Sequence, residues 1–183
     1  MLFTKFIIAA LFALSIGSAQ AAPDHLIDWV QAESHYKMTR PAATRVVRAA
    51  LVAAKKHRLD VELVLAVARQ ETGFRASARS SANARGVMQV IPRWHGEKIR
   101  GRNINDIRVG FDVGAHVLAE YLASKQGNTR RALAKYSGGA RRYADKVLRY
   151  RASILLAGHT NNEKFCTKPC VLANSSYNLA TPK

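Results

Sequence analysis

The segment that most constrains this 183-residue chain is a short apolar helix that ends in a carboxyl group. Residues 60–70 read DVELVLAVARQ, where apolar side chains recur at the three-to-four-residue spacing of a helix. Asp60 stands at the position that caps such a helix, and Gly73 is the residue type that ends one. Most glutamates at helix ends are solvated. Glu71, between an apolar helix and a glycine-bounded loop, instead suits a half-buried acid.

The run QETGFRASARSSANARGVMQVIP, which contains this acid, resembles the soluble lytic transglycosylase family pattern E-S-x-F-N-P-x-A-x-S-x-x-G-A-x-G-L-M-Q-x-x-P. The glutamate of that pattern falls on Glu71, its serine on Ser80, and its closing G-L-M-Q on residues 86–89. The tyrosine of a later signature, A-x-x-x-Y-N-x-G, falls on Tyr136. Similarity covers roughly residues 45–155, and so many spaced matches are more specific than one short motif.

The chain departs from the family pattern at a few positions. Thr72 replaces a serine but keeps a hydroxyl group, and Asn83 replaces a glycine with a residue that tolerates positive φ. Arg75-Ala76 stand where the family has Asn-Pro. Ser137 replaces the asparagine after the tyrosine, and its hydroxyl cannot make the paired hydrogen bonds of an amide. A substrate contact at that position is therefore left open.

The resemblance implies a mainly α, lysozyme-like domain of the goose-type lysozyme class with a catalytic cleft. It implies cleavage of the β-1,4 bond between N-acetylmuramic acid and N-acetylglucosamine, with formation of a 1,6-anhydromuramic acid end and no cofactor. By the same resemblance, Glu71 acts first as acid and then as base, and Tyr136 hydrogen-bonds to it. Ser80, Gly86 and Gln89 would contact the substrate, with the backbone of Gly86 approaching the sugar.

A glutamic acid can donate a proton at neutral pH only if its pKa is raised, and apolar burial has that effect. Arg69 or Arg75 near Glu71 would lower its pKa, so we expect both guanidinium groups to point to solvent. The nearest acids on either side of Glu71 in sequence, Glu62 and Glu97, belong to no matched motif. The chain is therefore expected to work with one carboxyl group.

The N-terminus has the features of a secretory signal peptide. Lys5 precedes an apolar run over residues 6–16, and Ala19-Gln20-Ala21 is a typical cleavage site. The apolar run is too short to span a bilayer. We expect cleavage after Ala21 and a periplasmic or secreted mature protein without a transmembrane segment.

Three parts are expected: the signal peptide (1–21), the transglycosylase domain (22–158) and a polar tail (159–183). Cys166 and Cys170 are the only cysteines, and in an exported protein they are expected to form a small disulfide. A metal site there would need two further ligands, which are not nearby in sequence. We expect a monomer.

Basic residues far outnumber acidic ones, with 29 Lys and Arg against 12 Asp and Glu and a formal net charge of +17. Such a field attracts polyanions but does not choose among them. Export makes peptidoglycan strands a nearer partner than nucleic acid. A small member of this family could serve general wall turnover or open gaps for a secretion or conjugation apparatus.

Two other functions remain open at this stage besides nucleic-acid binding. One is a hydrolytic muramidase of the goose-lysozyme type, in which Glu97 or Asp106 would position water. The other is a non-catalytic basic protein that binds the cell wall. Trp94 is equally compatible with stacking on a sugar and with a place in the core.

The remaining helices are predicted from periodicity and cap residues. Residues 96–110 are expected to be mostly loop, and a short hairpin could lie in the loops. The expected helices cover residues 24–30, Pro41 to Arg58, Phe111 to Gln126, a short helix capped by Thr129 and ending at Tyr136, and Arg141 to Ala157, with Gly158 ending the last.

Overall fold

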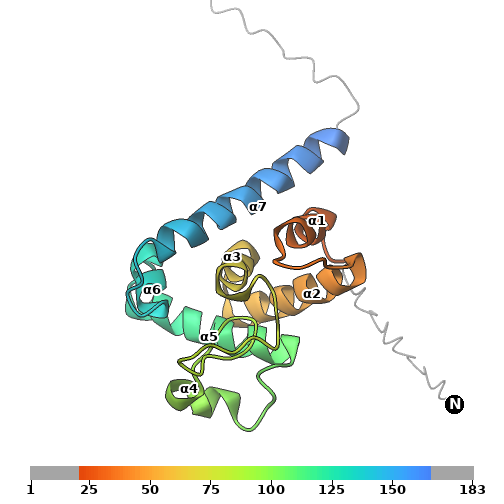
Figure 1. Ribbon diagram of the computed structural model, residues 1–183. Coiled ribbons are helices and arrows are strands. Elements are labelled where there is room, and N and C mark those ends of the chain that lie inside the picture. The colour runs from red at the N-terminus through yellow and green to blue at the C-terminus, as the bar shows by residue number, and fades with distance from the viewer. Residues whose placement is uncertain (1–20, 166–183) are drawn as a thin grey trace, which may run out of the picture.

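The computed structural model describes residues 21–165, so residues 1–20 of the expected signal peptide and the pair Cys166 and Cys170 lie outside the described part. That part forms seven α-helices with isolated bridges and no β-strand, which confirms the predicted mainly helical fold class (Figure 1). No helix in it is long and apolar enough to cross a membrane. The helices are α1 (Asp24–Glu33), α2 (Arg40–His57), α3 (Val61–Thr72), α4 (Pro92–Ile99), α5 (Ile107–Ser124), α6 (Thr129–Tyr136) and α7 (Tyr143–Phe165).

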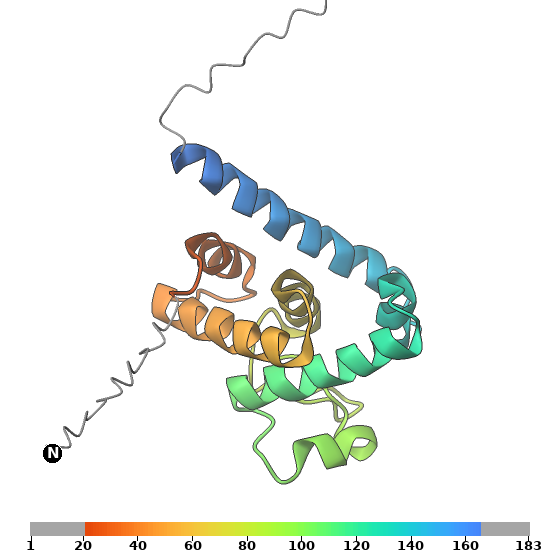
Figure 2. The ribbon, with the colours of Figure 1, turned by 180° about the vertical axis from the view of Figure 1, so that it is seen from behind.

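Helix α3 forms the centre of the molecule. Its six consecutive residues from Leu63 to Ala68 are all buried, as expected for a helix that is apolar on every side. Helix α2 packs on one side, and α7 covers another (Figures 1 and 2). Because both ends of α3 are fixed by its neighbours, its last turn presents Glu71 at a defined place.

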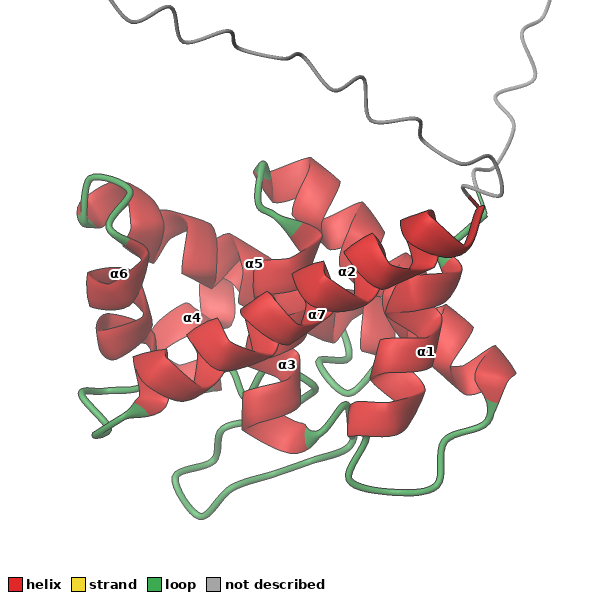
Figure 3. Cartoon of the chain, turned by 90° about the horizontal axis from the view of Figure 1, so that it is seen from above, coloured by secondary structure: helices red, strands yellow, loops and turns green. Residues whose placement is uncertain are grey.

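A second layer supports α3 through the pairing of α2 with α5. Small buried residues on one face of α2, among them Ala43, Ala50 and Ala54, let neighbouring helices approach closely. Phe111 and Leu118 of α5 are fully buried in the same core. Helix α1 packs against both α2 and α7, and α7 lies across the other helices in the view from above (Figure 3).

The region predicted as loop over residues 96–110 is partly helical, so that prediction is wrong at both ends. Pro92 stands in the first turn of α4, and the helix runs on to Ile99. Helix α5 begins at Ile107, before the predicted Phe111, because the Asp106 carboxylate accepts hydrogen bonds from the first backbone N–H groups of the helix. Proline and aspartate are common helix-start residues.

Two other helix ends also differ from the prediction. Asn128, and not Thr129, caps α6 through a hydrogen bond from the Arg131 backbone N–H to its side chain. Helix α7 continues through Gly158 to Phe165. A single glycine inside a helix costs only about 1 kcal/mol, which the packing of α7 against α1 can offset.

Asp60 occupies the predicted N-cap position of α3 but makes no capping hydrogen bond there. Its carboxylate instead accepts a hydrogen bond at 2.5 Å from Arg151 on α7. The contact therefore joins α7 to the start of α3 and leaves the helix end uncapped by this side chain.

The loop after α3 is pinned by a short antiparallel pairing, the kind of hairpin that the sequence left open. Arg85 and Val90 exchange backbone hydrogen bonds of 2.9 and 3.0 Å. Gly86 has φ +77°, and a Cβ atom there would lie 2.5 Å from the Ile104 carbonyl oxygen. A side chain at position 86 is therefore excluded by both conformation and space.

Gly114 on α5 fits against Met88 at the tip of this hairpin. A Cβ atom at position 114 would lie 2.5 Å from the Met88 Cβ and 2.6 Å from its sulfur. Met88 is fully buried beneath the loop and has little room to move.

Gly114→Ala is expected to lower the free energy of unfolding by about 1–3 kcal/mol, because the added methyl group overpacks this contact. Chemical denaturation would measure it. Gly96→Ala is the matched control, since a Cβ there meets no atom within 4 Å. The control should be neutral or slightly stabilising in a helix. Equal stability of the Gly114 variant and the wild type would contradict the packing argument.

Candidate active site

A cleft of about 430 Å³ opens beside the last turn of α3. The hairpin loop, α4, α5 and the turn between α6 and α7 form its other walls. The functional candidates among its lining residues are Glu71, Ser80, Gln89, Trp94, His95, Tyr121, Lys135, Tyr136, Ser137 and Tyr143.

Glu71 is the centre of this cleft. It is partly buried, and the Tyr143 hydroxyl donates a hydrogen bond of 2.5 Å to its Oε1 atom. Burial raises the pKa of Glu71 from 4.5 to about 7, while the hydrogen bond from Tyr143 acts in the opposite direction. The predicted rise in pKa is confirmed, and a large fraction of this carboxyl group is protonated at neutral pH.

The two neighbouring arginines do not act on this pKa, but one of them lies elsewhere than predicted. Arg75 is exposed, as expected. Arg69 does not point to solvent: its Nε donates a hydrogen bond of 3.0 Å to Glu33, and its guanidinium lies 4.7 Å from the ring centre of Tyr150. Its charge is therefore paired with another acid and directed away from Glu71.

Tyr136 lines the cleft, but the predicted hydrogen bond from its hydroxyl to Glu71 is wrong. The Tyr136 hydroxyl donates to the Met88 carbonyl at 2.8 Å, and Tyr143 makes the contact with Glu71 instead. Burial, followed by the nearby Glu71, raises the pKa of Tyr136, so its proton stays in place for the contact with the hairpin.

Tyr143 is the site residue that the sequence reasoning missed. It is the first residue of α7, directly after the turn that contains Gly138 and Gly139, and its ring is buried. The helical periodicity of residues 141–157 made it one of the apolar positions of the last predicted helix. The available signal was its place seven residues after the motif tyrosine, where a tight turn returns the chain towards the cleft.

The other predicted contact residues differ in where they lie. Ser80 lines the cleft, and its hydroxyl accepts a hydrogen bond from the Ala84 N–H. Gln89 also lines it, and its side-chain amide donates to the carbonyls of Ala78 and Gly86. Gly86 is buried and lies outside the lining, so the expected approach of its backbone to a sugar is corrected to a packing role against the backbone of Ile104.

The departures from the family pattern are accommodated locally. The Thr72 hydroxyl donates to the Val87 carbonyl at 2.9 Å and joins the end of α3 to the hairpin. Asn83 has φ +62°, in agreement with its predicted tolerance. The Ser137 hydroxyl donates to the Ala134 carbonyl of its own helix at 3.1 Å. Ser137 therefore lines the cleft without extending an amide into it.

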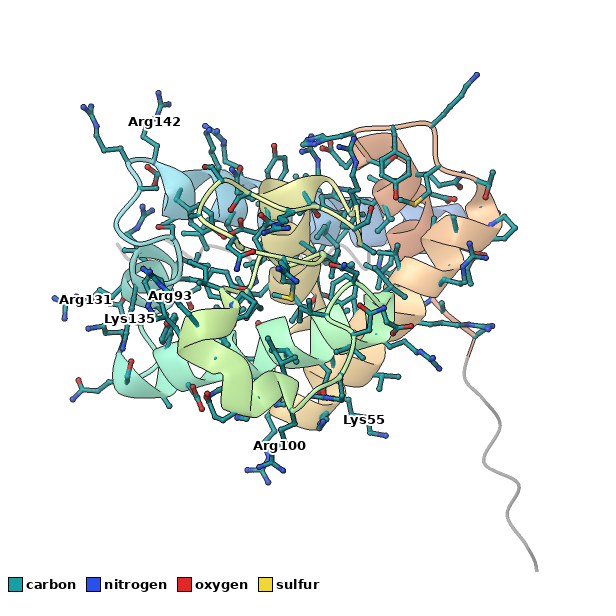
Figure 4. All side chains as sticks on the ribbon, turned by 60° about the horizontal axis from the view of Figure 1, so that its bottom comes forward. Lys55, Arg93, Arg100, Arg131, Lys135 and Arg142 are labelled. Carbon is teal, nitrogen blue, oxygen red and sulfur yellow. The ribbon has the colours of Figure 1, made fainter. Side chains whose placement is uncertain are left out.

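Aromatic rings and cations lie together along the edge of the cleft formed by α4 and α6. Trp94 is 59% exposed, which excludes the core among its two predicted uses. The Arg93 guanidinium lies 4.7 Å from its ring centre, and the Lys135 ammonium lies 4.6 Å from the ring of Tyr121. Arg93, Arg131 and Lys135 project together from this edge (Figure 4). Such a surface can stack on sugars and attract carboxylates.

Glu71 is the only acid among the residues that line the cleft. The alternative acid Glu97 is exposed and forms an ion pair with Lys98, and Asp106 caps α5. Across residues 21–165, no cluster of three or more His, Cys, Asp or Glu side chains could hold a metal ion. Proton transfer by one carboxyl group is the chemistry that this arrangement favours.

Comparison with known proteins points to the same family as the sequence motif. A model of the transglycosylase SLT domain matches residues 48–154, close to the extent of the motif resemblance. Among solved structures, the chain resembles an inactive glutamate-to-glutamine mutant of the lytic transglycosylase Slt from Pseudomonas aeruginosa, with 23% sequence identity and a TM-score of 0.54. The match covers 63% of this chain and 24% of that one, so the chain spans about a quarter of that protein's length. It supports the lysozyme-like fold class.

Tyr143→Phe is expected to raise the pKa of Glu71 above about 7, because it removes the hydrogen bond that favours the carboxylate. A rise of about one unit corresponds to the usual strength of such a bond. A carbon-13 NMR titration of protein labelled at glutamate carboxyl groups would measure the pKa directly. The control is Tyr136→Phe, whose hydroxyl donates to Met88 and not to Glu71. A larger shift in the control would contradict this assignment.

Glu71→Gln is expected to stabilise the fold in a pH-dependent way. The pKa of Glu71 in the folded state, about 7, exceeds its unfolded value of 4.5, so the proton stabilises the folded state. This contribution is fully present below the unfolded pKa and is lost as the pH rises through 7, by at most about 3 kcal/mol. Chemical denaturation at about pH 4 and pH 8 would measure the free energy of unfolding of both proteins. Between these pH values the wild type should lose more stability than the variant. An equal loss in both proteins would show that Glu71 does not titrate in this range.

Proposed function

The chain belongs to the transglycosylase SLT domain family, and from this premise we propose that it is a peptidoglycan lytic transglycosylase in which Glu71 is the single acid and base. The observation that carries the proposal is the state of this carboxyl group. It is the only acid that lines the cleft, burial brings its pKa to about 7, and Tyr143 fixes its orientation.

The reaction requires a proton on the leaving oxygen and a nucleophile at C1 of the muramic acid. Protonated Glu71 donates its proton to the glycosidic oxygen as the C1–O bond breaks. The 6-hydroxyl of the same sugar then forms a bond to C1 and returns its proton to the Glu71 carboxylate. The products are a free 4-hydroxyl on N-acetylglucosamine and a 1,6-anhydro end, and no water is consumed. The attack is intramolecular and therefore entropically favoured.

The remaining cleft residues suit a sugar chain that carries peptides. Ser80 and Gln89 lie where they can bind or orient N-acetyl or peptide groups, and exposed Trp94 offers a face for stacking on a sugar ring. Arg93 and Lys135 supply positive charge beside the aromatic rings. The carboxylates of peptidoglycan stem peptides complement this charge.

The absence of a second carboxyl group from the cleft lining favours this reaction over hydrolysis. Most glycosidases use a second carboxylate to activate water or to attack C1. Of the two acids considered for that role, Glu97 pairs with Lys98 and Asp106 caps a helix, and neither lines the cleft. A non-catalytic binding protein would have no use for a partly buried carboxyl group whose ionisation is opposed by its surroundings.

The site of action follows from the sequence at the N-terminus. We propose export by cleavage of the signal peptide (1–21), a transglycosylase domain over residues 22–158 and a separate polar tail (159–183). The periplasm or the cell exterior is where the peptidoglycan substrate lies. There the protein would serve wall turnover or open the wall locally for a secretion or conjugation apparatus.

The test is digestion of purified sacculi by the mature protein, with products identified by mass spectrometry. The wild type should release products that end in 1,6-anhydromuramic acid. Glu71→Gln should lower the rate by about 100-fold or more, because it removes the general acid, and should still sediment with sacculi. The wild-type rate should fall as the pH rises above about 7, where the acid loses its proton.

Products that end in reducing muramic acid would instead indicate a hydrolytic muramidase. An unchanged rate in Glu71→Gln would remove Glu71 from the mechanism and leave a wall-binding protein as the better account.

A further inference from the structure

A second and larger groove, of about 650 Å³, lies between α2 and the start of α5. It shares no lining residue with the catalytic cleft. Apolar side chains form part of its surface, including Ile107, Val109 and Val52. Val52 is 69% exposed, the highest value among the exposed large apolar residues of the described part. An exposed aliphatic residue in a concave surface is typical of a binding site for apolar groups.

Positive charge surrounds this apolar surface, called here the α2–α5 groove. Arg45 and Arg48 of α2 line it one helical turn apart, and both are exposed. Neither forms an ion pair with an acid within residues 21–165. Arg108 on α5 is 83% exposed and forms a long ion pair of 3.6 Å with Asp106.

The two acids that line the groove are engaged within the protein. Asp106 caps α5. The Asp112 carboxylate accepts hydrogen bonds of 2.7, 2.8 and 2.8 Å from Lys56, His57 and Arg102. Burial acts to raise the pKa of Asp112, but these three donors outweigh it and hold the pKa well below its usual value. Arg45 and Arg48 therefore leave the groove with surplus positive charge.

Lys56 and His57 lie in the last turn of α2, and both contact the Asp112 carboxylate. This shared contact fixes the last turn of α2 to α5. The walls of the groove are thus held together by a network of charges. A preformed groove binds a ligand without the cost of ordering its own walls.

We propose that the α2–α5 groove is a docking site for an acidic, amphipathic segment of a partner protein. Apolar side chains of a ligand would complement the apolar surface, and carboxylates beside them would complement the arginines. An amphipathic peptide segment offers both, with apolar residues on one face and acidic residues beside them. A glycan strand has no apolar side chains to occupy the groove, and a flat membrane surface does not fill a concave one.

The chain itself supplies no suitable occupant. Residues 1–20 and 166–183, which lie outside the described part, contain no Asp or Glu and carry Lys5, Lys168 and Lys183. Their charge has the same sign as the groove. A second copy of the chain, with a net charge of +17, would be repelled as a whole. The occupant is therefore assigned to another protein.

Docking at this groove leaves the catalytic cleft free. Helix α5 contributes Ile107 and Val109 to the groove but Val117 and Tyr121 to the cleft, so the two sites lie at different points along one helix. A bound partner would hold the enzyme at a place on the wall without covering Glu71.

The test is selection of a displayed library of random 16-residue peptides on the mature protein, followed by fluorescence binding measurements with the synthesised winners. The selected peptides should combine apolar residues at three-to-four-residue spacing with Asp or Glu. Val52→Asp, and separately Arg45→Ala with Arg48→Ala, should weaken their binding by about tenfold or more.

Matched controls separate docking from general charge and folding effects. Leu156→Asp changes an equally exposed apolar residue (66%) on α7, and Lys55→Ala with Lys146→Ala removes two exposed cations outside the groove. Both controls should bind the peptides as the wild type does. Circular dichroism and the rate of sacculus digestion should be unchanged in all four variants.

The proposal would be overturned if no peptide were selected, or if the selected peptides lacked acidic residues. It would also be overturned if Val52→Asp left peptide binding unchanged, or if Leu156→Asp weakened it equally. Binding to phosphatidylglycerol vesicles that is lost in Val52→Asp, without peptide binding, would assign the groove to a membrane surface instead.

Discussion

The chemistry of the cleft depends on the partial burial of one carboxyl group at the end of an apolar helix. Desolvation disfavours the charged form of Glu71, and one hydrogen bond from Tyr143 limits that effect, so the pKa settles at about 7. Further hydrogen-bond donors would have kept the pKa of Glu71 near the usual value of a carboxyl group. Deeper burial without a donor would have raised the pKa so far that the proton stayed bound at neutral pH. A group that must give up a proton and take it back in one reaction needs the intermediate condition.

Much of the motif around this acid serves to hold the hairpin loop in place. Thr72 joins the end of α3 to the loop, Tyr136 binds the carbonyl of Met88, and Gln89 binds the carbonyls of Ala78 and Gly86. These contacts bring backbone groups of the loop to fixed positions beside Glu71. Residues that a motif marks as functional can therefore act through the shape of the loop, and Gly86 does so without facing the cleft.

Local sequence patterns predicted six of the seven described helices and the central acid, because periodicity and cap residues act within one or two turns. The short helix α4 was missed. The errors within the site concern partners far apart in sequence. Tyr143 is 72 residues from Glu71, and Arg69 is 36 residues from its partner Glu33. Which of Tyr136 and Tyr143 reaches Glu71 depends on how α7 crosses α3. No local pattern carries that information, and the motif reached Tyr136 but not Tyr143.

The net charge of the sequence likewise does not say where the cations lie or what they bind. A value of +17 predicts attraction to polyanions in general, but the structure divides the cations between two chemical settings. At the cleft, Arg93 and Lys135 lie over aromatic rings, where sugars with charged substituents can bind. At the α2–α5 groove, Arg45 and Arg48 flank exposed aliphatic surface, which a sugar cannot use. Equal charge beside different neighbours suits different ligands, so under the two proposals these cations would serve two separate recognition sites and not one diffuse attraction to the wall.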